Sequence, residues 1–175
     1  MSGRVLGLVL AGGRSSRFGS DKALAELDGE TLLDRATSQL RTWCNEVRIA
    51  GRERGLPDWP RAGMGPLAGI AAGLRHAQAH GFASVLSCGV DSVELPGDLL
   101  ATLSPAPAYF ASQPVIGHWP VNALGTLEDI LEGDGRHSML AFAHAIGARE
   151  VQTDAKPANI NTPADLAAAE KRRGL

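Results

Sequence analysis

The sequence predicts an α/β fold in which a doubly wound, mainly parallel β-sheet carries helices on both faces, as a single domain over residues 1–175. Short apolar runs alternate with segments of helical periodicity along most of the chain. The first apolar run leads into a glycine-rich, basic loop, and ligand-binding loops of such sheets follow the carboxyl ends of strands. A chain of 175 residues is long enough for one domain with a substantial core.

The first elements can be read directly from their spacing. Val5–Leu10, VLGLVL, is apolar without helical periodicity, which is typical of a central parallel strand covered on both faces. Asp28-Gly29 predicts a turn, and Thr31 is a suitable N-cap for a helix. Apolar residues of that helix recur at helical spacing, at Leu32, Leu33, Ala36, Leu40 and Trp43.

The middle of the chain continues the alternation. Val47–Ala50 and Val85–Cys88 are short strand-like runs. Between them, residues 65–80 predict a helix entered through a Gly-Pro turn, with one apolar face. This order of strand, helix and strand is that of a parallel sheet.

The later elements follow weaker patterns. Thr162-Pro163-Ala164-Asp165 combines an N-cap, a proline at the first helical position and an early acidic residue, and predicts a terminal helix through Lys171. We further expect helices over 96–103, 127–132 and 138–146, and extended segments over 109–112 and Val121–Leu124.

Composition limits the class of partner and the compartment. The net charge of -2 and the lack of a basic run argue against nucleic acid as a partner and favour a small ligand. Cys44 and Cys88 form no C-x-x-C pair or disulfide framework, which predicts a reducing compartment, the cytoplasm. The N-terminal apolar core is too short for a convincing signal peptide, and no apolar run approaches the ~20 residues that span a membrane.

The loop after the first strand carries the strongest chemical signal. Gly12, Gly13 and Gly19 allow backbone N–H groups to line an anion-binding concavity, and Arg14, Arg17 and Lys22 add positive charge. The spacing matches neither the P-loop nor the G-x-G-x-x-G dinucleotide motif. A generic glycine-rich turn is the alternative, although ordinary turns do not require placed basic residues.

Residues 10–22, LAGGRSSRFGSDK, resemble the signature loop of the nucleotidyltransferases, and most of all that of the molybdenum cofactor guanylyltransferases. The resemblance implies a three-layer α/β/α, Rossmann-like nucleotidyltransferase fold. It also implies that the loop surrounds a nucleotide, with Arg17 and Lys22 on the phosphates. The nucleotide-binding residues implied for the end of the strand are Leu10, Ala11, Gly12 and Gly13.

A second resemblance concerns the nucleotide base. Residues 65–70, GPLAGI, match the second signature of that family, and Asp58 stands seven residues before Gly65, where the family has an aspartate associated with guanine. A carboxylate can accept two hydrogen bonds, from guanine N1–H and the exocyclic amine. The alternative for Asp58 is a solvated loop aspartate.

A third resemblance implies a metal site. Residues 87–96 resemble Pro-Cys-Asp-x-Pro-x-Leu-Pro of the family, with Asp91 at the metal-binding aspartate and Gly89-Val90 in place of Pro-Cys. A carboxylate just past a strand end can hold Mg²⁺, which usually takes one or two protein carboxylates. Asp91 could instead cap the following turn, and Glu94 is a reserve ligand.

The fourth resemblance lies near the end of the chain. Residues 159–166 are similar to Asn-x-Asn-Thr-Pro-Glu-Asp-Leu of the family, which implies that Asn161 lies near the metal and the acceptor substrate. Helix-entry capping is the alternative. Two weaker similarities depart from the pattern: Trp119 replaces a histidine, with His118 one residue earlier, and Gly51 stands where relatives often carry asparagine.

These resemblances imply a Mg²⁺-dependent enzyme that transfers GMP from GTP to molybdenum-loaded molybdopterin and releases pyrophosphate. Arg17, Lys22 and Asp91 would be catalytic, and an ionised phosphate acceptor needs no general base. We expect a monomer with no membrane partner, in transient contact with proteins that deliver or receive the cofactor. The alternatives are a cytidylyltransferase or sugar-phosphate nucleotidyltransferase of the same fold, and a nucleotide-binding regulator without turnover.

Overall fold

The centre of the molecule is a six-stranded sheet, seen in a computed structural model that describes residues 3–12, 21–52, 54–92, 94–153 and 160–172. β1 pairs in parallel with β4 and β5, β6 pairs in parallel with β8, and β7 is antiparallel to both of its neighbours. The predicted mainly parallel sheet is therefore confirmed. Its order is β4 (Glu46–Ala50), β1 (Val5–Leu10), β5 (Ser84–Gly89), β7 (Gln113–Pro120), β6 (Ala108–Phe110) and β8 (Arg149–Val151).

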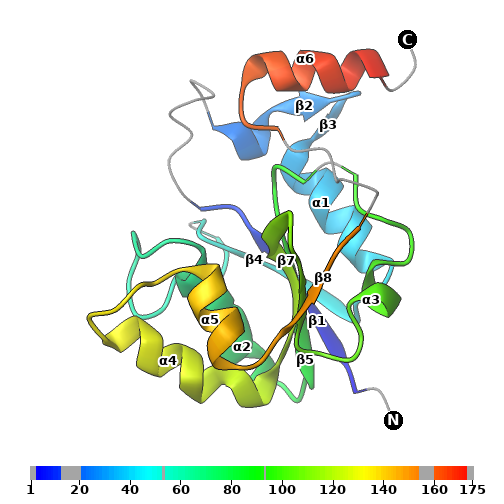
Figure 1. Cartoon of the computed structure of the whole chain (residues 1–175). Helices are drawn as coiled ribbons and strands as arrows, with labels where there is room; N and C mark the ends of the chain where they lie inside the picture. The colour runs from blue at the N-terminus through cyan, green and yellow to red at the C-terminus, as the bar shows by residue number, and fades with distance from the viewer. Residues whose placement is uncertain (1–2, 13–20, 53, 93, 154–159, 173–175) are drawn as a thin grey trace.

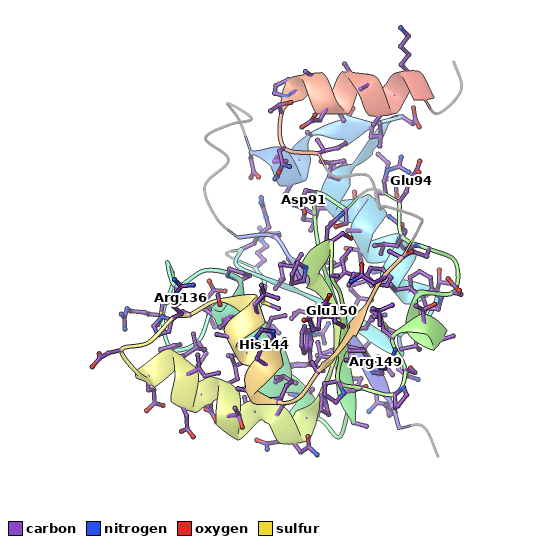
Figure 2. The ribbon with its side chains drawn as sticks, in the orientation of Figure 1. Asp91, Glu94, Arg136, His144, Arg149 and Glu150 are labelled. Atoms are coloured by element: carbon purple, nitrogen blue, oxygen red, sulfur yellow. The ribbon has the colours of Figure 1, made fainter. Side chains whose placement is uncertain are left out.

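Helices cover both faces of this sheet (Figure 1). Side chains fill the space between the sheet and the helices (Figure 2). The buried apolar ones form one cluster on each face of the sheet. The three-layer α/β/α arrangement is thus confirmed. One face carries α1 (Leu32–Arg41) and α3 (Leu99–Thr102), and the other carries α2 (Pro66–Ala79), α4 (Leu124–Glu132) and α5 (Met139–Ala145).

The central strand β1 shows why its sequence is apolar throughout. Leu6 and Leu8 belong to the cluster beneath α2, while Val5 and Val9 belong to the cluster on the opposite face. Successive side chains of a strand point to opposite faces, so a strand buried on both sides needs no polar positions. The whole of β1 except its last residue, Leu10, is buried.

Helix α2 lies unusually close to β1 because of two glycines one helical turn apart. A Cβ on Gly69 would stand 2.7 Å from Leu10 Cδ2, and one on Gly73 would stand 2.6 Å from Leu8 Cδ2. Gly65 caps the helix with φ 78°, and Pro66 follows at its first turn, as the Gly-Pro signal predicts. The start of α2 is thereby held against the carboxyl end of β1.

A smaller unit lies beyond that end of the sheet (Figure 1). β2 (Glu26–Leu27) and β3 (Glu30–Thr31) form a hairpin whose predicted turn, Asp28-Gly29, has φ values of 55° and 80°. Helix α6 (Pro163–Arg172) packs on this hairpin. Their common core consists of Leu27, Leu32, Ile160 and Ala169.

One predicted element is wrong. Val121–Leu124, expected to be extended, forms the 3-10 turn η2 (Val121–Ala123), and α4 begins directly at Leu124. The strand of this region lies before it, at β7, and ends at Pro120, after which Val121 N–H bonds the Ala83 carbonyl and the chain turns. β2, β3, β7 and β8 were not predicted as strands. Within the described part of the chain, no helix combines the length and apolar character that crossing a bilayer requires.

Candidate active site

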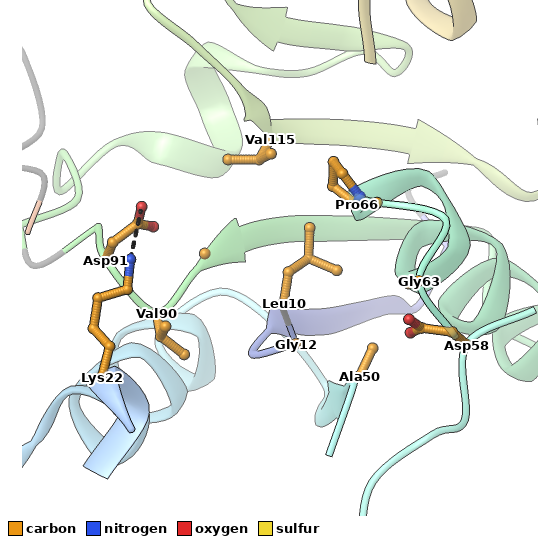
Figure 3. A pocket seen from close by; sticks show the side chains of 13 residues that line it. Leu10, Gly12, Lys22, Ala50, Asp58, Gly63, Pro66, Val90, Asp91 and Val115 are labelled. Atoms are coloured by element: carbon orange, nitrogen blue, oxygen red, sulfur yellow. Dashed lines mark ion pairs between the residues drawn. The ribbon is translucent and has the colours of Figure 1, made fainter. Parts of the chain in front are cut away.

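A pocket of about 300 Å³ opens at the carboxyl edge of the sheet, where β1, β4 and β5 end (Figure 3). Ligands of doubly wound sheets bind at this edge, and ligand pockets begin at about this size. The described residues that line it are Leu10, Gly12, Lys22, Ala50, Asp58, Gly63, Gly65, Pro66, Gly69, Gly89, Val90, Asp91 and Val115.

One end of the pocket carries an ion pair between Lys22 and Asp91 (Figure 3). Lys22 begins the short 3-10 helix η1 (Lys22–Leu24), whose N-cap Asp21 accepts the Ala23 N–H at 3.2 Å. Lys22 Nζ lies 3.7 Å from Asp91 Oδ2, and the two side chains keep 20% and 25% of their exposure. A cation and a carboxylate therefore face the same space and remain accessible to a ligand.

Two backbone hydrogen bonds hold the segment that carries Asp91 beyond β5. Gly89 leaves room for the carboxylate, since a Cβ there would stand 2.5 Å from Asp91 Oδ1 and the carboxylate would have to shift. Val90 N–H bonds the Leu10 carbonyl at 3.3 Å, and Ile160 N–H bonds the Asp91 carbonyl at 2.9 Å. The backbone on both sides of Asp91 is therefore held by hydrogen bonds, although Gly89 stands where the resemblance led us to expect a proline. Glu94 is exposed, does not line the pocket and lies apart from Asp91 (Figure 2).

Asp58 stands at the other end of the pocket and points into it (Figure 3). Its loop is tied to α2 by the bond from Trp59 N–H to the Ala68 carbonyl, at 3.1 Å. Burial raises the pKa of the Asp58 carboxyl. No hydrogen bond from a described residue contributes to this shift, so the carboxylate can accept from a ligand.

The floor of the pocket depends on close contact between the ends of β1 and β4. Ala11 N–H bonds the Ala50 carbonyl at 3.0 Å. Gly51 has φ 86°, and a Cβ on it would stand 2.6 Å from the N and Cα atoms of Gly12. Gly51 therefore allows the backbone contact that shapes the site, which an asparagine in this conformation would obstruct.

The structure brings most of the predicted site residues together, namely Leu10, Gly12, Lys22, Asp58 and Asp91. Ala11 is nearly buried and does not line the pocket. Gly13 and Arg17 lie outside the described residues.

Asn161 lies near this group but not in the pocket wall. Its N–H and that of Thr162 bond Asp165 Oδ2 at 3.0 Å each, and Thr162 Oγ1 accepts the Asp165 N–H at 3.1 Å. This reciprocal capping at the start of α6 is the structural alternative that the sequence left open. Because Ile160 bonds the Asp91 backbone, the same segment also adjoins the pocket.

His118 and Trp119 have structural roles. His118 Nε2 lies 2.7 Å from Ser84 Oγ, and its Nδ1 lies 3.1 Å from the Leu103 carbonyl. Trp119 is fully buried and donates its indole N–H to Ser87 Oγ at 2.9 Å. Both side chains are core residues of β7 rather than pocket residues.

Sequence reasoning missed two contributions to the site. Val115 lines the pocket from β7, a strand that the sequence pattern did not reveal. Arg52 forms a bidentate ion pair with Asp21, in which Nη1 lies 3.0 Å from Oδ1 and Nη2 lies 2.8 Å from Oδ2. Its hydrogen bonds hold the pKa of the Asp21 carboxyl below its usual value. The only sequence signal for Arg52 was its place beside Gly51.

The donor set near Asp91 suits one class of metal ion. Among the described residues, no three His, Cys, Asp or Glu side chains gather as a metal site. A single carboxylate at this end of the pocket fits Mg²⁺, which usually binds one or two carboxylates together with substrate phosphates and water. It does not fit zinc, which takes three or four protein ligands.

Comparison with known proteins agrees with this geometry. The chain is 40% identical to a molybdenum cofactor guanylyltransferase of Acidiphilium cryptum, over 95% of this chain and 94% of the relative, and 34% identical to one of Rhizobium leguminosarum, over 95% and 92%. The fold is shared with the molybdopterin-guanine dinucleotide biosynthesis protein A of Archaeoglobus fulgidus, at a TM-score of 0.71 and 19% identity, over 95% and 97% of the two chains. Residues 7–150 match the MobA-like NTP transferase domain, and the chain belongs to that family.

Proposed function

We propose that the protein transfers GMP from GTP to the terminal phosphate of molybdenum-loaded molybdopterin, giving the guanine dinucleotide and pyrophosphate. The observation that carries this proposal is the placement of the Lys22–Asp91 pair and Asp58 at opposite ends of one pocket. Relatives up to 40% identical carry the name of this activity. The pocket offers one end to a base and the other to phosphates.

The base end provides the preference for guanine. The Asp58 carboxylate can accept hydrogen bonds from guanine N1–H and the exocyclic amine at once. Cytosine has no pair of donors in that arrangement, so it would leave a partly buried carboxylate without a full set of partners. This argues for GTP over CTP as the donor.

The phosphate end provides the chemistry. An ionised oxygen of the molybdopterin phosphate attacks the α-phosphorus of GTP, and the bond from that phosphorus to the oxygen bridging to the β-phosphate breaks, releasing pyrophosphate. No proton has to be removed from the acceptor, so the residues need only align the reactants and balance negative charge. Lys22 would do so at the α-phosphate and the leaving group. The resemblance of the loop gives Arg17 the same role.

Asp91 is the residue that would hold Mg²⁺. Asn161 follows Ile160, whose N–H bonds the Asp91 carbonyl, and its amide oxygen could assist through a water molecule. Bound there, the ion would supply positive charge to the triphosphate oxygens. This assignment rests on the Asp91 carboxylate at the phosphate end of the pocket and on the backbone hydrogen bonds that join its segment to β1 and to Ile160.

The two cysteines bear on the compartment in which the protein works. Cys44 and Cys88 are free thiols, and burial raises the pKa of the Cys44 thiol to about 12, which makes it a poor nucleophile. Free, unreactive thiols agree with a reducing compartment, and we assign the protein to the cytoplasm. We further propose that it acts as a monomer, with one nucleotidyltransferase domain over residues 1–175 and transient contacts to cofactor-handling proteins.

The decisive experiment offers the protein a choice of nucleotide. Purified protein is mixed with Mg²⁺, equimolar GTP and CTP, and molybdenum-loaded molybdopterin, and the dinucleotide product is identified by mass spectrometry. Guanine dinucleotide with pyrophosphate release is the expected result. Cytosine dinucleotide would overturn the assignment of Asp58, and GTP binding without any product would make the protein a nucleotide-binding regulator.

A further inference from the structure

We propose that Arg52 is a positioning residue for the transfer reaction, and that it holds Lys22 in place through Asp21. The inference rests on the proposed guanylyl transfer, because that function gives Lys22 its contact with phosphate. Arg52 does not line the pocket and is given no direct contact with substrate.

Asp21 is held at both of its carboxylate oxygens. Both carboxylate oxygens accept from the Arg52 guanidinium, at 3.0 and 2.8 Å, and Oδ1 also accepts the Ala23 N–H at 3.2 Å. One carboxylate therefore joins Arg52 to the first turn of η1, the helix that Lys22 begins. A bidentate arginine pair fixes orientation as well as distance.

The main chain around Arg52 is held by a turn at the end of β4. Leu56 N–H bonds the Ile49 carbonyl at 2.7 Å, Gly51 N–H bonds the Leu56 carbonyl at 3.3 Å, and Gly55 N–H bonds the Arg52 carbonyl at 2.9 Å. This turn closes directly onto the end of β4. Arg52 thus transmits the position of the sheet edge to η1.

The reach of Lys22 into the pocket depends on where η1 places its backbone. Its ammonium lies 3.7 Å from Asp91 Oδ2 at the end of a long side chain, so a shift of η1 changes the position of the charge. Asp91 is fixed from β5 and Ile160. The Arg52–Asp21 pair is the matching anchor on the lysine side.

The pair is poorly placed to stabilise the fold as a whole. The Arg52 and Asp21 side chains keep 26% and 45% of their exposure, and ion pairs in such surroundings contribute little to folding stability. Its loss should therefore barely change the melting temperature. An effect on catalysis can then be separated from an effect on folding.

The test is a double-mutant cycle of Arg52→Ala and Lys22→Ala. Two quantities are measured, kcat/KM for guanylyl transfer and the Kd for GTP with Mg²⁺ and no acceptor. We expect Lys22→Ala to lower kcat/KM by roughly 100-fold or more, and Arg52→Ala to lower it about 10-fold through misplacement of the lysine. In the Lys22→Ala background, Arg52→Ala should have almost no further effect on either quantity.

Two further variants separate positioning from direct contact. Asp21→Asn keeps an oxygen that can accept the Ala23 N–H but loses one acceptor for Arg52, so it should reproduce the defect of Arg52→Ala. Arg52→Lys keeps the charge without the two-pronged geometry and should stay defective. Arg48→Ala is the matched control, since Arg48 lies in the middle of β4 and pairs with Glu46 rather than with Asp21. It should leave both quantities unchanged.

The proposal would be overturned if the fold-reductions of Arg52→Ala and Lys22→Ala multiplied in the double variant. It would also be overturned if Asp21→Asn transferred GMP at the wild-type rate, or if Arg52→Lys were fully active. Failure of the proposed function gives a different result. A wild-type protein that forms no guanine dinucleotide refutes the transfer reaction, whereas the cycle on GTP affinity still reports whether Arg52 acts through Lys22.

Discussion

At the scale of single residues, the two carboxylates of the pocket differ in what holds them. Asp91 is fixed by backbone contacts and pairs with Lys22, whereas Asp58 has no donor among the described residues and lies partly buried, which raises its pKa. A group in the second situation is arranged for a ligand that brings its own donors. Guanine is such a ligand.

Asp58→Asn tests this assignment. The amide keeps the size of the side chain but replaces one acceptor with a donor, so it cannot accept from both N1–H and the amine of guanine. We expect kcat/KM with GTP to fall roughly 10- to 100-fold, and the ratio of GTP to CTP use to fall with it. Initial rates with each nucleotide provide the measurement.

The control for Asp58 is Asp129→Asn, which changes an exposed aspartate of α4 and should leave both rates unaltered. An Asp58→Asn protein with an unchanged preference for GTP would show that Asp58 is an ordinary loop aspartate. The base would then have to be recognised elsewhere in the pocket.

Gly51→Ala tests the backbone contact between β1 and β4. Gly51 has a positive φ, where a side chain costs about 1–2 kcal/mol, and the new Cβ would stand 2.6 Å from the Gly12 backbone. Crowding of this kind costs typically 1–3 kcal/mol. Together these costs amount to about 2–5 kcal/mol, and we expect the melting temperature to fall by about 4–20 °C, at 2–4 °C per kcal/mol for a chain of this size.

Gly125→Ala is the matched control for Gly51→Ala. Gly125 lies inside α4 with open space where its Cβ would stand, and alanine there should be neutral or stabilising. Equal melting temperatures of Gly51→Ala and the wild type would mean that the ends of β1 and β4 can separate freely.

At the scale of elements, the sequence predicted those whose signals are local. α1 starts where Thr31 caps it, with its hydroxyl accepting the Asp34 N–H, and α2 starts after Gly65. β1 and β5 are continuous apolar runs, and both were predicted within one residue of their observed bounds. Capping, glycine-proline turns and full burial each leave a mark in the sequence.

The missed strand β7 has no such local mark. Its sequence, QPVIGHWP, includes two prolines and a glycine, which argue against a strand. Pro114 falls where the pairing with β6 is irregular, and a Cβ on Gly117 would stand 2.2 Å from the Trp119 ring. β7 is therefore determined by its partners β5 and β6. Since β7 was not predicted, the position of Val115 in the pocket wall was not predicted either.

In the site, too, residues that belong to a sequence motif could be predicted, and residues placed by contacts distant in the sequence could not. Lys22, Asp58 and Asp91 could be chosen because each belongs to a motif, and the structure brings all three to one pocket. Arg52 acts on a partner 31 positions away in the sequence. Asn161 takes part in helix capping through its main chain, which a motif cannot distinguish from a role in binding.

The unit formed by β2, β3 and α6 gives a prediction for an element. Ile160 is buried in its small core, and its N–H bonds the Asp91 carbonyl. Ile160→Ala should cost about 2 kcal/mol or more of stability and should also lower activity, because Asp91 loses a fixed neighbour. Thermal melts and guanylyl-transfer rates are the measurements.

Ile160→Val is the comparison for this element. Valine keeps most of the buried volume and should cost only 0.5–1.5 kcal/mol, with activity close to that of the wild type. If Ile160→Ala were as active as Ile160→Val when both are measured well below their melting temperatures, the α6 unit would not support Asp91.

At the scale of the whole molecule, the carboxyl edge of the sheet collects residues from distant parts of the chain, while the interior remains almost wholly apolar. Four described polar residues are buried, Ser84, Ser87, Ser92 and His118. His118 is the only titratable side chain among these four, and it joins β7 to β5 and to the end of α3. The dependence of global stability on pH should therefore be sensitive to it.

Burial lowers the pKa of His118, and its hydrogen bond to the Leu103 carbonyl only partly opposes this effect. Below about pH 6.5 the His118 ring binds a proton more readily in the unfolded chain than in the folded protein. The contribution of His118 to the free energy of unfolding is therefore complete above that pH. It is lost as the pH falls toward the lowered pKa, by at most about 1.4 kcal/mol per pH unit.

Urea unfolding of the wild type between pH 7.5 and 5 should show this loss, and His118→Gln should have a flatter profile even if it is less stable at every pH. His144→Gln changes an exposed histidine of α5 and should keep the wild-type slope. His76 also has a pKa lowered by burial, but it lies nearer the surface, so His76→Gln should remove less of the slope. Parallel profiles for the wild type and His118→Gln would mean that the buried histidine takes up its proton without unfolding the core, and NMR titration of its ring in the wild type would then show a pKa near that of a free histidine.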